Sequence, residues 1–366
     1  MDTLTQPATQ PADIVGDGII DSDIHPSPKE GIKSLFPYLG STWARYIEKF
    51  EDIQYGPYSG AYGYPRYMPQ TARRDAWPPG GGLPGSDLDF MREQHLDRHG
   101  IALGVLEPLG LSTSSRNLDL GSAMCSAIND WQLDVFVEPE PRLRASIVVA
   151  PDAPDAAARE IDARKADRRF AQVQFYSLTQ EPLGRQKYWP IYERAEAHGL
   201  PIGIHVGGPS GARTGSGWPS YYIEEHLSLV YSIQTHLMSL VLEGVCERFP
   251  KLRFLLIEGG LVWSISLRNR LDRLWKLMGD EVPKAVLPPS EYIRRNFLFS
   301  TQPVEEPFRA DLLPDLFEKV GTESILYASD YPHWDYDDPV YAFRGGMSDE
   351  MRARIFRENA LTFYRL

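Results

Sequence analysis

The sequence predicts an α/β fold, a (β/α)8 barrel of the TIM type, and three observations support this prediction. Eight short apolar runs, typical of strands, alternate with longer segments typical of helices. Helical crossovers between successive strands make those strands parallel, and eight such units close into a barrel. The segment after the first run, His25-Pro26-Ser27-Pro28, lacks the glycine-rich turn that an open dinucleotide-binding sheet carries there.

The first 85 residues contain two segments outside the regular alternation. Residues 1–16 are rich in Thr, Gln, Pro and Asp and are expected to form a flexible tail, so that one barrel domain covers residues 17–366. A first strand at Gly18–His25 is followed by an insertion, about residues 26–85, that is rich in aromatic residues, Pro and Gly. A loop of this length is usually functional or disordered, and the aromatic content argues against disorder. We interpret it as a lid or as a segment that shapes the substrate pocket; a packed extension and an oligomer contact are the alternatives.

Regular alternation begins at residue 86. Ser86 and Asp87 can cap a helix that runs through Arg98 and ends at Gly100. Seven further strands are expected at Ile101–Glu107, Leu143–Ala150, Ala171–Ser177, Pro201–Val206, Leu252–Glu258, Asn296–Ser300 and Ser324–Asp330. Helices are expected at Leu118–Phe136, Asp152–Asp167, Lys187–His198, Ile223–Phe249, Leu261–Met278 and Ser348–Tyr364, and one more ends near Val320.

Composition excludes several classes of partner. The 366 residues are 42% apolar, ample for a large core, and the formal net charge is −12 without a block of basic residues, so neither nucleic acid nor an anionic membrane is expected to bind. Cys125 and Cys246 form neither a disulfide framework nor a metal-type spacing, which fits a reducing compartment. The N-terminus has no apolar region of a signal peptide, and no window reaches the roughly 18 apolar residues of a membrane span. We therefore expect a soluble, cytoplasmic protein.

The first strand carries two polar residues at its end. Asp23 and His25 are two residues apart, so in a strand they point to the same face. An acid and an imidazole that converge at a strand end are a natural start for a metal site. Taken alone, the stretch is equally compatible with an Asp23 that caps a turn and a His25 that is hydrogen-bonded in a loop.

Four of the expected strands end in residues that can bind a metal. These residues are Asp23 and His25 on the first strand, His205 on the fifth, Glu258 on the sixth and Asp330 on the eighth. In a barrel these ends share one mouth, where active sites lie. Charged and imidazole groups that follow apolar runs are costly to desolvate unless they are paired or bound to a metal. The pattern therefore predicts a metal site, with a buried ion-pair network as the alternative.

Five segments of the chain match motifs of a known superfamily. They are Asp21-Ser22-Asp23-Ile24-His25, Ile204-His205, Phe249-Pro250-Lys251-Leu252-Arg253-Phe254, Ile257-Glu258-Gly259-Gly260 and Ala328-Ser329-Asp330-Tyr331-Pro332. Through them the chain resembles the amidohydrolase superfamily, in the branch that contains aminocarboxymuconate-semialdehyde decarboxylase and related carboxylate decarboxylases. The segments extend from the first strand to the eighth, so the resemblance covers nearly the whole chain.

The resemblance implies one divalent metal ion, held by Asp23, His25, His205 and Asp330. The first strand of this branch normally supplies His-x-His, and some of its decarboxylases carry Glu at the first position, so Asp23 is compatible with metal binding. The sixth strand of the family ends in a catalytic His, where this chain has Glu258. Glu258 would replace that His as a base or become an additional ligand.

The residue types also indicate the metal and its chemistry. Two carboxylates and two imidazoles, without a thiolate, suit Zn²⁺, which we expect, or Mn²⁺. A bound metal lowers the pKa of its water and polarises a substrate oxygen. Glu258 would then be the nearby general base or proton shuttle. The resemblance implies that Asp330 both contacts the metal and passes a proton.

Four more residues are candidates for the substrate pocket. His333 lies three residues after Asp330 and is expected to contact the substrate or Asp330, with a loop hydrogen bond as the alternative. Trp218, Tyr222 and Trp334 are candidates for an aromatic wall that binds the substrate, although Trp and Tyr are also ordinary packing residues.

These observations leave three hypotheses for function. The first is a metal-dependent carboxy-lyase acting on a small aromatic or unsaturated carboxylic acid, with Asp330 as the proton donor. The second is a metal-dependent hydrolase of an amide, lactone or C–C bond, in which Glu258 is the base for metal-activated water. The third is an inactive barrel that only binds. In each case the expected partner is a small molecule, and the chain is expected to form a homodimer or a higher homo-oligomer.

Overall fold

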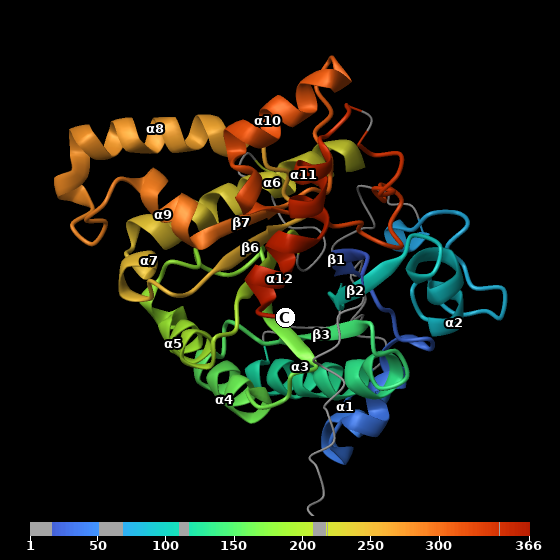
Figure 1. Cartoon of the computed structure of the whole chain (residues 1–366). Helices are drawn as coiled ribbons and strands as arrows, with labels where there is room; N and C mark the ends of the chain where they lie inside the picture. Colours follow the sequence, from blue (N-terminus) through green and yellow to red (C-terminus); the bar gives the residue numbers. More distant parts are fainter. Residues whose placement is uncertain (1–16, 51–68, 110–116, 208–216, 218, 344) are drawn as a thin grey trace, which may run out of the picture.

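The computed structural model of the chain describes residues 17–50, 69–109, 117–207, 217, 219–343 and 345–366 (Figure 1). The predicted tail at residues 1–16, the middle of the predicted insertion at residues 51–68, and Trp218 lie outside these residues. Among the described residues, no helix is both long enough and apolar enough to cross a membrane.

Eight strands form one parallel sheet whose spatial order is the order of the sequence. Their bounds are β1 Ile19–Ile24, β2 Ile101–Leu106, β3 Leu143–Val148, β4 Phe170–Tyr176, β5 Ile202–His205, β6 Phe254–Ile257, β7 Phe297–Ser300 and β8 Ile325–Leu326. The sheet closes where the chain after β8 meets β1. The amide of Ser22 donates to the carbonyl of Tyr327 (3.0 Å), and the amide of His25 donates to the carbonyl of Tyr331 (2.7 Å). The predicted (β/α)8 barrel is confirmed.

Helices surround the barrel and connect its strands (Figure 1). Their bounds are α1 Ser41–Lys49, α2 Leu88–Met91, α3 Leu118–Gln132, α4 Pro154–Arg164, α5 Trp189–His198, α6 Tyr222–Leu242, α7 Val245–Arg248, α8 Trp263–Met278, α9 Pro289–Asn296, α10 Leu313–Val320, α11 Asp349–Ala353 and α12 Asn359–Tyr364. Residues next to the helices fix where several of these helices begin and end. Asp87 accepts a hydrogen bond from the amide of Phe90 (2.9 Å) at the start of α2, and Gly199, in the left-handed conformation, ends α5.

The helices differ from the sequence prediction in several details. The long helix expected at Ile223–Phe249 is two helices, α6 and α7, because Gly244 takes a φ of 83° between them. The helix expected through Arg98 is α2 followed by a π-helical turn, Arg92–Leu96. Helix α9, which begins at two prolines, was not predicted.

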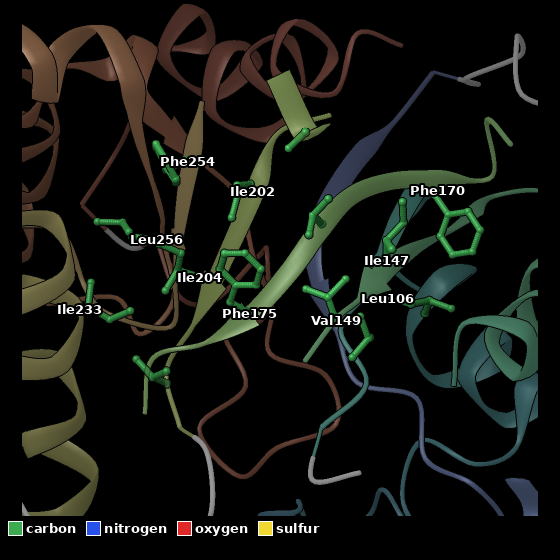
Figure 2. Packing of buried hydrophobic residues seen from close by; sticks show 14 of the residues in the cluster. Leu106, Ile147, Val149, Phe170, Phe175, Ile202, Ile204, Ile233, Phe254 and Leu256 are labelled. Atoms are coloured by element: carbon green, nitrogen blue, oxygen red, sulfur yellow. The ribbon is translucent and has the colours of Figure 1, made fainter. Parts of the chain in front are cut away.

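The larger part of the core lies between the strands and the helices. Figure 2 shows Phe175 of β4, Ile204 of β5 and Leu256 of β6 on this side of the sheet, together with Ile233 of α6. All four are buried. Val173, Ile202 and Phe254 lie two residues earlier on the same three strands and belong to the same cluster, which is the period of a pleated sheet.

A second apolar cluster fills the interior of the barrel. Its strand residues are Ile20, Leu103, Val105, Ala171, Leu255, Ile257, Leu298 and Leu326. Helix α12 joins this cluster through Ala360, Phe363 and Tyr364. The barrel is therefore a packed core and not a pore, and the polar residues at the C-terminal ends of the strands can form a site at its mouth.

The described parts of the predicted insertion pack in two places. A 3-10 helix, Gly31–Tyr38, and α1 lie beside α3, and the Tyr38 hydroxyl donates to Asp134 (2.5 Å). Near the end of the insertion, the carbonyl of Thr71 accepts from the amide of Trp334 (2.8 Å). The insertion thus reaches the turn after β8 at the barrel mouth, and its function as a lid stays a prediction.

Candidate metal centre

An irregularity in β1 turns Asp23 and His25 into the barrel. Between two paired positions the chain advances by three residues on β1, Asp21–Ile24, but by two on β2, Gly104–Leu106. Such a bulge shifts the side-chain alternation by one residue. Ile20 packs in the barrel interior, and the bulge lets Asp23 and His25 face the same space.

Two histidines present the same nitrogen to the site. Nδ1 of His25 lies 2.7 Å from the carbonyl of Glu107, and Nδ1 of His205 lies 2.6 Å from the carbonyl of Val206. A carbonyl only accepts, so each Nδ1 donates and each neutral ring has its lone pair on Nε2. This arrangement, in which a backbone carbonyl orients the ring, is typical of metal-ligating histidines.

Both Nε2 atoms face carboxylates. Nε2 of His25 lies 3.2 Å from Asp23 and 2.7 Å from Asp330, and Nε2 of His205 lies 3.0 Å from Glu258 and 3.7 Å from Asp23. Two acceptors this close repel each other unless a proton or a cation lies between them. The site therefore requires a proton or a cation at its centre.

A metal ion fits this requirement better than hydrogen bonds do. Asp23, His25, His205 and Glu258 each offer a ligand atom within 4.8 Å of the others. Both oxygens of Asp23 and Nε2 of His205 are buried, yet none of the three atoms makes a hydrogen bond. Buried polar atoms are nearly always satisfied. Atoms that lie close but are not aimed at one another instead converge on a common point, which is the arrangement that a bound ion requires.

Burial sets the pKa values of these groups in the absence of an ion. Burial raises the pKa of Asp23 well above its usual value and lowers that of His25 well below its own, which disfavours a proton on His25 as the missing charge. Burial also opposes a charged His205, but the carboxylates of Asp23 and Glu258 outweigh it and raise the pKa to about 10. Binding of a metal at His205 would therefore displace a proton.

Glu258 and Asp330 reach the mouth through strained backbone. They have φ values of 56° and 62°, in the left-handed region that residues with a Cβ rarely adopt. Such conformations cluster at functional sites because the surrounding structure must hold them. The amide of Glu258 is held by Ser300 Oγ (2.9 Å), and Asp330 accepts from Gln302 Nε2 (3.1 Å).

His333 joins Asp330 on the outer side of the cluster. Its Nδ1 lies 2.5 Å from Oδ1 of Asp330, and its ring stacks on His25 with centroids 4.4 Å apart. Burial lowers the pKa of His333. The sequence-predicted contact between His333 and Asp330 is thus present in the structure.

Asp21 ties the first strand to the last. Its Oδ1 accepts from the amides of Asp23 (3.1 Å) and Ser329 (2.9 Å), and its Oδ2 lies 2.8 Å from Nε2 of His95. All of these groups are buried. Asp21 therefore fixes the backbone that carries Asp23 against the backbone that carries Asp330.

Two of the predicted wall residues lie together at the mouth. The indole of Trp334 donates to the hydroxyl of Tyr222 (2.9 Å), and the two rings meet edge to face, 6.1 Å apart. The predicted Trp218 lies outside the described residues. Its part in the wall stays a prediction.

Sequence reasoning missed three residues near the site. Glu107 directly follows β2 and is buried, and burial raises its pKa to about 8; its position at a strand end was a usable signal. His226 on α6 and Asp335 in the turn after β8 form a pair, with Nε2 and Oδ2 3.1 Å apart. Nothing in the sequence brings a helix residue to a turn 109 positions later.

The chain was compared with known families and structures. The family model for amidohydrolases matches residues 20–366. Gamma-resorcylate decarboxylase from Polaromonas sp. is 23% identical over 317 residues, which cover 78% of this chain and 93% of that protein.

Solved structures share the fold. A 5-carboxyvanillate decarboxylase from Sphingomonas paucimobilis has a TM-score of 0.70 at 22% identity, over 96% of this chain and 100% of the other. A dihydroxybenzoic acid decarboxylase from Polaromonas sp., with bound manganese and the inhibitor 2-nitroresorcinol, has a TM-score of 0.67 at 19% identity, over 96% and 97%. Because the family model spans all eight strands and the mouth that they form, this chain belongs to the amidohydrolase family and is an enzyme.

Proposed function

We propose that the protein is a metal-dependent carboxy-lyase that acts on a small aromatic carboxylic acid. The observation that carries this proposal is the cluster of buried, unsatisfied ligand atoms with Asp330 and His333 on its outer side. The names of its relatives support it, because gamma-resorcylate and 5-carboxyvanillate are aromatic carboxylic acids. We drop the hypothesis of an inactive barrel that only binds, since the chain is an enzyme of the amidohydrolase family.

Asp23, His25, His205 and Asp330 would hold one divalent ion in this proposal. The oxygen and nitrogen donors suit both Zn²⁺ and Mn²⁺, and the manganese in a related structure supports the second. When bound, the ion would supply a positive charge that polarises the substrate carboxylate and a neighbouring oxygen. Glu258 would be an additional ligand or a base, since its carboxylate lies 3.0 Å from His205.

Asp330 and His333 would carry out the proton transfer to the substrate. Decarboxylation breaks the bond between the ring and the carboxylate, releases CO2 and places a proton on the ring carbon. Asp330 would deliver that proton, and His333, 2.5 Å from it, would hold and restore it. Tyr222 and Trp334 would pack against the aromatic ring and exclude water from the reacting carbon.

The test is release of CO2. The protein loaded with Mn²⁺ or Zn²⁺ is incubated with gamma-resorcylate, 5-carboxyvanillate, other hydroxybenzoates and muconate-type acids, and we expect CO2 and the decarboxylated product from at least one of them. The Asp330→Asn variant should release none. Absence of CO2 from every acid, with cleavage of an amide or lactone, would overturn the proposal.

A hydrolase is the second candidate, and Glu258 is the observation that favours it. A carboxylate stands where a base for water activation is needed, at the end of β6 and beside His205. A hydrolase incorporates oxygen from solvent, so product formed in ¹⁸O-labelled water should carry the label. Unlabelled product excludes this candidate.

We further infer that two copies of the chain associate through α6. Ile223, Leu227 and Tyr231 lie four residues apart on this helix and are 66%, 64% and 60% exposed. Between Glu225 and Glu243 the helix carries no Asp, Glu, Lys or Arg. From Leu227 onward this face is apolar and uncharged, and such a face is complementary to a second copy of itself in a two-fold interface.

Light scattering after gel filtration tests this inference. The wild type should be a dimer or a higher oligomer, and Leu227→Glu should reduce its mass to that of the monomer. Leu277→Glu, an equally exposed position on α8, serves as the control and should leave the mass unchanged. A monomeric wild type, or a Leu227→Glu variant of unchanged mass, would contradict it.

A further inference from the structure

A second group of metal-competent side chains lies beside the candidate metal centre. His226 of α6 and Asp335 of the turn after β8 have Nε2 and Oδ2 3.1 Å apart. One ligand atom each of His226, Asp335 and Glu258 lie within 4.8 Å of one another. Glu258 thus belongs to both groups, with His205 on one side and His226 on the other.

Several carboxylates lie close together at the mouth of the barrel. Four carboxylates converge there: Asp23, Glu258, Asp330 and Asp335. Within the described residues, every ion pair that these carboxylates form is with an imidazole, and none is with Lys or Arg.

The second group also has the composition of a ligand set. It contains one imidazole and two carboxylates, which suits Zn²⁺ and Mn²⁺. The other ring nitrogen of His226 contacts the pocket wall. Its Nδ1 lies 3.5 Å from the hydroxyl of Tyr222, which accepts a hydrogen bond from the indole of Trp334. This leaves Nε2 facing Asp335, and both side chains are partly buried and not free on the surface.

We propose that His226, Asp335 and Glu258 form a second divalent-cation site, in which the Glu258 carboxylate bridges two ions. Sharing of a carboxylate between adjacent ions is how a two-metal centre is built. The second ion would give a carboxylate substrate a cationic partner outside the first ligand set. This inference rests on the proposed function for the substrate class, but it concerns residues of α6 and of the turn after β8, which the first set does not include.

Manganese binding tests the proposal without any substrate. The full-length protein is stripped with a chelator and titrated with Mn²⁺, the bound metal is counted after dialysis, and the sample is examined by electron paramagnetic resonance. We expect two Mn²⁺ per chain and a spectrum in which the two ions are magnetically coupled. His226→Gln and Asp335→Asn should each bind one Mn²⁺ and show the uncoupled six-line pattern, because each substitution weakens one of the three ligands of the second site.

His198→Gln is the matched control. His198, at the end of α5, also pairs with an Asp, with Nε2 2.6 Å from Oδ1 of Asp162, but it lies at the opposite end of the barrel. This variant should keep two coupled ions. One uncoupled Mn²⁺ in the wild type, or two ions retained in both site variants, would overturn the second site and leave the proposed function standing. No bound Mn²⁺ or Zn²⁺ at all would instead overturn the proposed function, and with it this inference.

Discussion

Oε2 of Glu258 lies 3.0 Å from Nε2 of His205, although the alternation of β6 would turn Glu258 away from the barrel. Phe254 and Leu256 lie four and two residues before Glu258, on the same side of the strand, and both point into the helix layer. The left-handed φ of 56° at Glu258 reverses the direction of the side chain. The contact thus depends on a backbone conformation that the surrounding structure must hold.

The backbone strain at Glu258 predicts an unusual order of stability. Glu258→Gly should be more stable than Glu258→Ala by about 1 kcal/mol, because Gly adopts positive φ without a Cβ clash. Urea unfolding in the presence of a chelator measures the difference. The same pair of substitutions at Arg270, exposed on α8, should show the reverse order, by about 1 kcal/mol in favour of Ala. An Ala variant at 258 as stable as the Gly variant would contradict this account.

The Asp23 side chain should stabilise the protein when a metal ion is bound and destabilise it when the metal has been removed. Its two buried oxygens make no hydrogen bond, and an unsatisfied buried polar group costs about 1–3 kcal/mol. Asp23→Asn supplies an amide N–H that can donate to a facing Nε2 atom, which the carboxylate cannot do, so it should raise the melting temperature in a chelator. Because it weakens the metal site, it should lower the melting temperature relative to wild type in Mn²⁺. Thermal melts under the two conditions test this; a variant less stable in both would show that Asp23 has a purely structural role.

Removal of His333 should affect the reaction and not the metal. If His333 supports proton transfer at Asp330, His333→Gln should lower kcat by about 10²–10⁴-fold with the metal content unchanged. Steady-state decarboxylation and metal analysis on the same preparation separate the two effects. Loss of metal from His333→Gln, with none from His198→Gln, would instead identify His333 as a ligand.

Trp334 should contribute to substrate binding. An aromatic contact is worth about 1 kcal/mol, so Trp334→Ala should raise KM about 5-fold with a smaller change in kcat. Leu277→Ala, which removes an exposed apolar side chain from α8, should change neither constant. An unchanged KM for Trp334→Ala would remove Trp334 from the aromatic wall.

Glu140 predicts a pH dependence of stability that is independent of the site. Burial opposes its charge, but hydrogen bonds from Arg142 and Arg92 outweigh burial and lower its pKa to about 2. A lowered carboxyl pKa stabilises the fold above the unfolded pKa, about 4.5, and this stabilisation is lost as pH falls from there toward 2.

The substitution Glu140→Gln tests this dependence. It should destabilise by up to about 3 kcal/mol at pH 7, and the difference from wild type should narrow by about 1 kcal/mol at pH 4. Urea unfolding at pH 7, 5 and 4 provides the measurement. Glu138→Gln, whose carboxylate pairs with Arg169 in solvent, should cost less than about 1 kcal/mol. If the difference in unfolding free energy between Glu140→Gln and wild type did not change with pH, the pKa of Glu140 would not be lowered in the folded protein.

The strand-end candidates could be found from sequence because the barrel has a simple rule. Strands joined by helical crossovers are parallel, so the residues that end β1, β5, β6 and β8 share one mouth. His205 and Asp330 needed only this rule. His226 and Asp335 could not be found, because a helix residue and a turn residue meet only through the angle at which α6 packs on the barrel.

The sequence by itself determined the order of the strands, the closed barrel, the family and the residue types at its mouth. The strand order and the closed barrel follow from local periodicity and from the chirality of crossover connections, which act on short stretches of chain. The family follows from the resemblance of five short segments to its motifs. Only the tertiary structure decided the directions of Asp23 and Glu258. A bulge between Asp21 and Ile24 turns the first, and a positive φ turns the second. Neither is preferred by the residues themselves, so the packing of neighbouring strands must impose both.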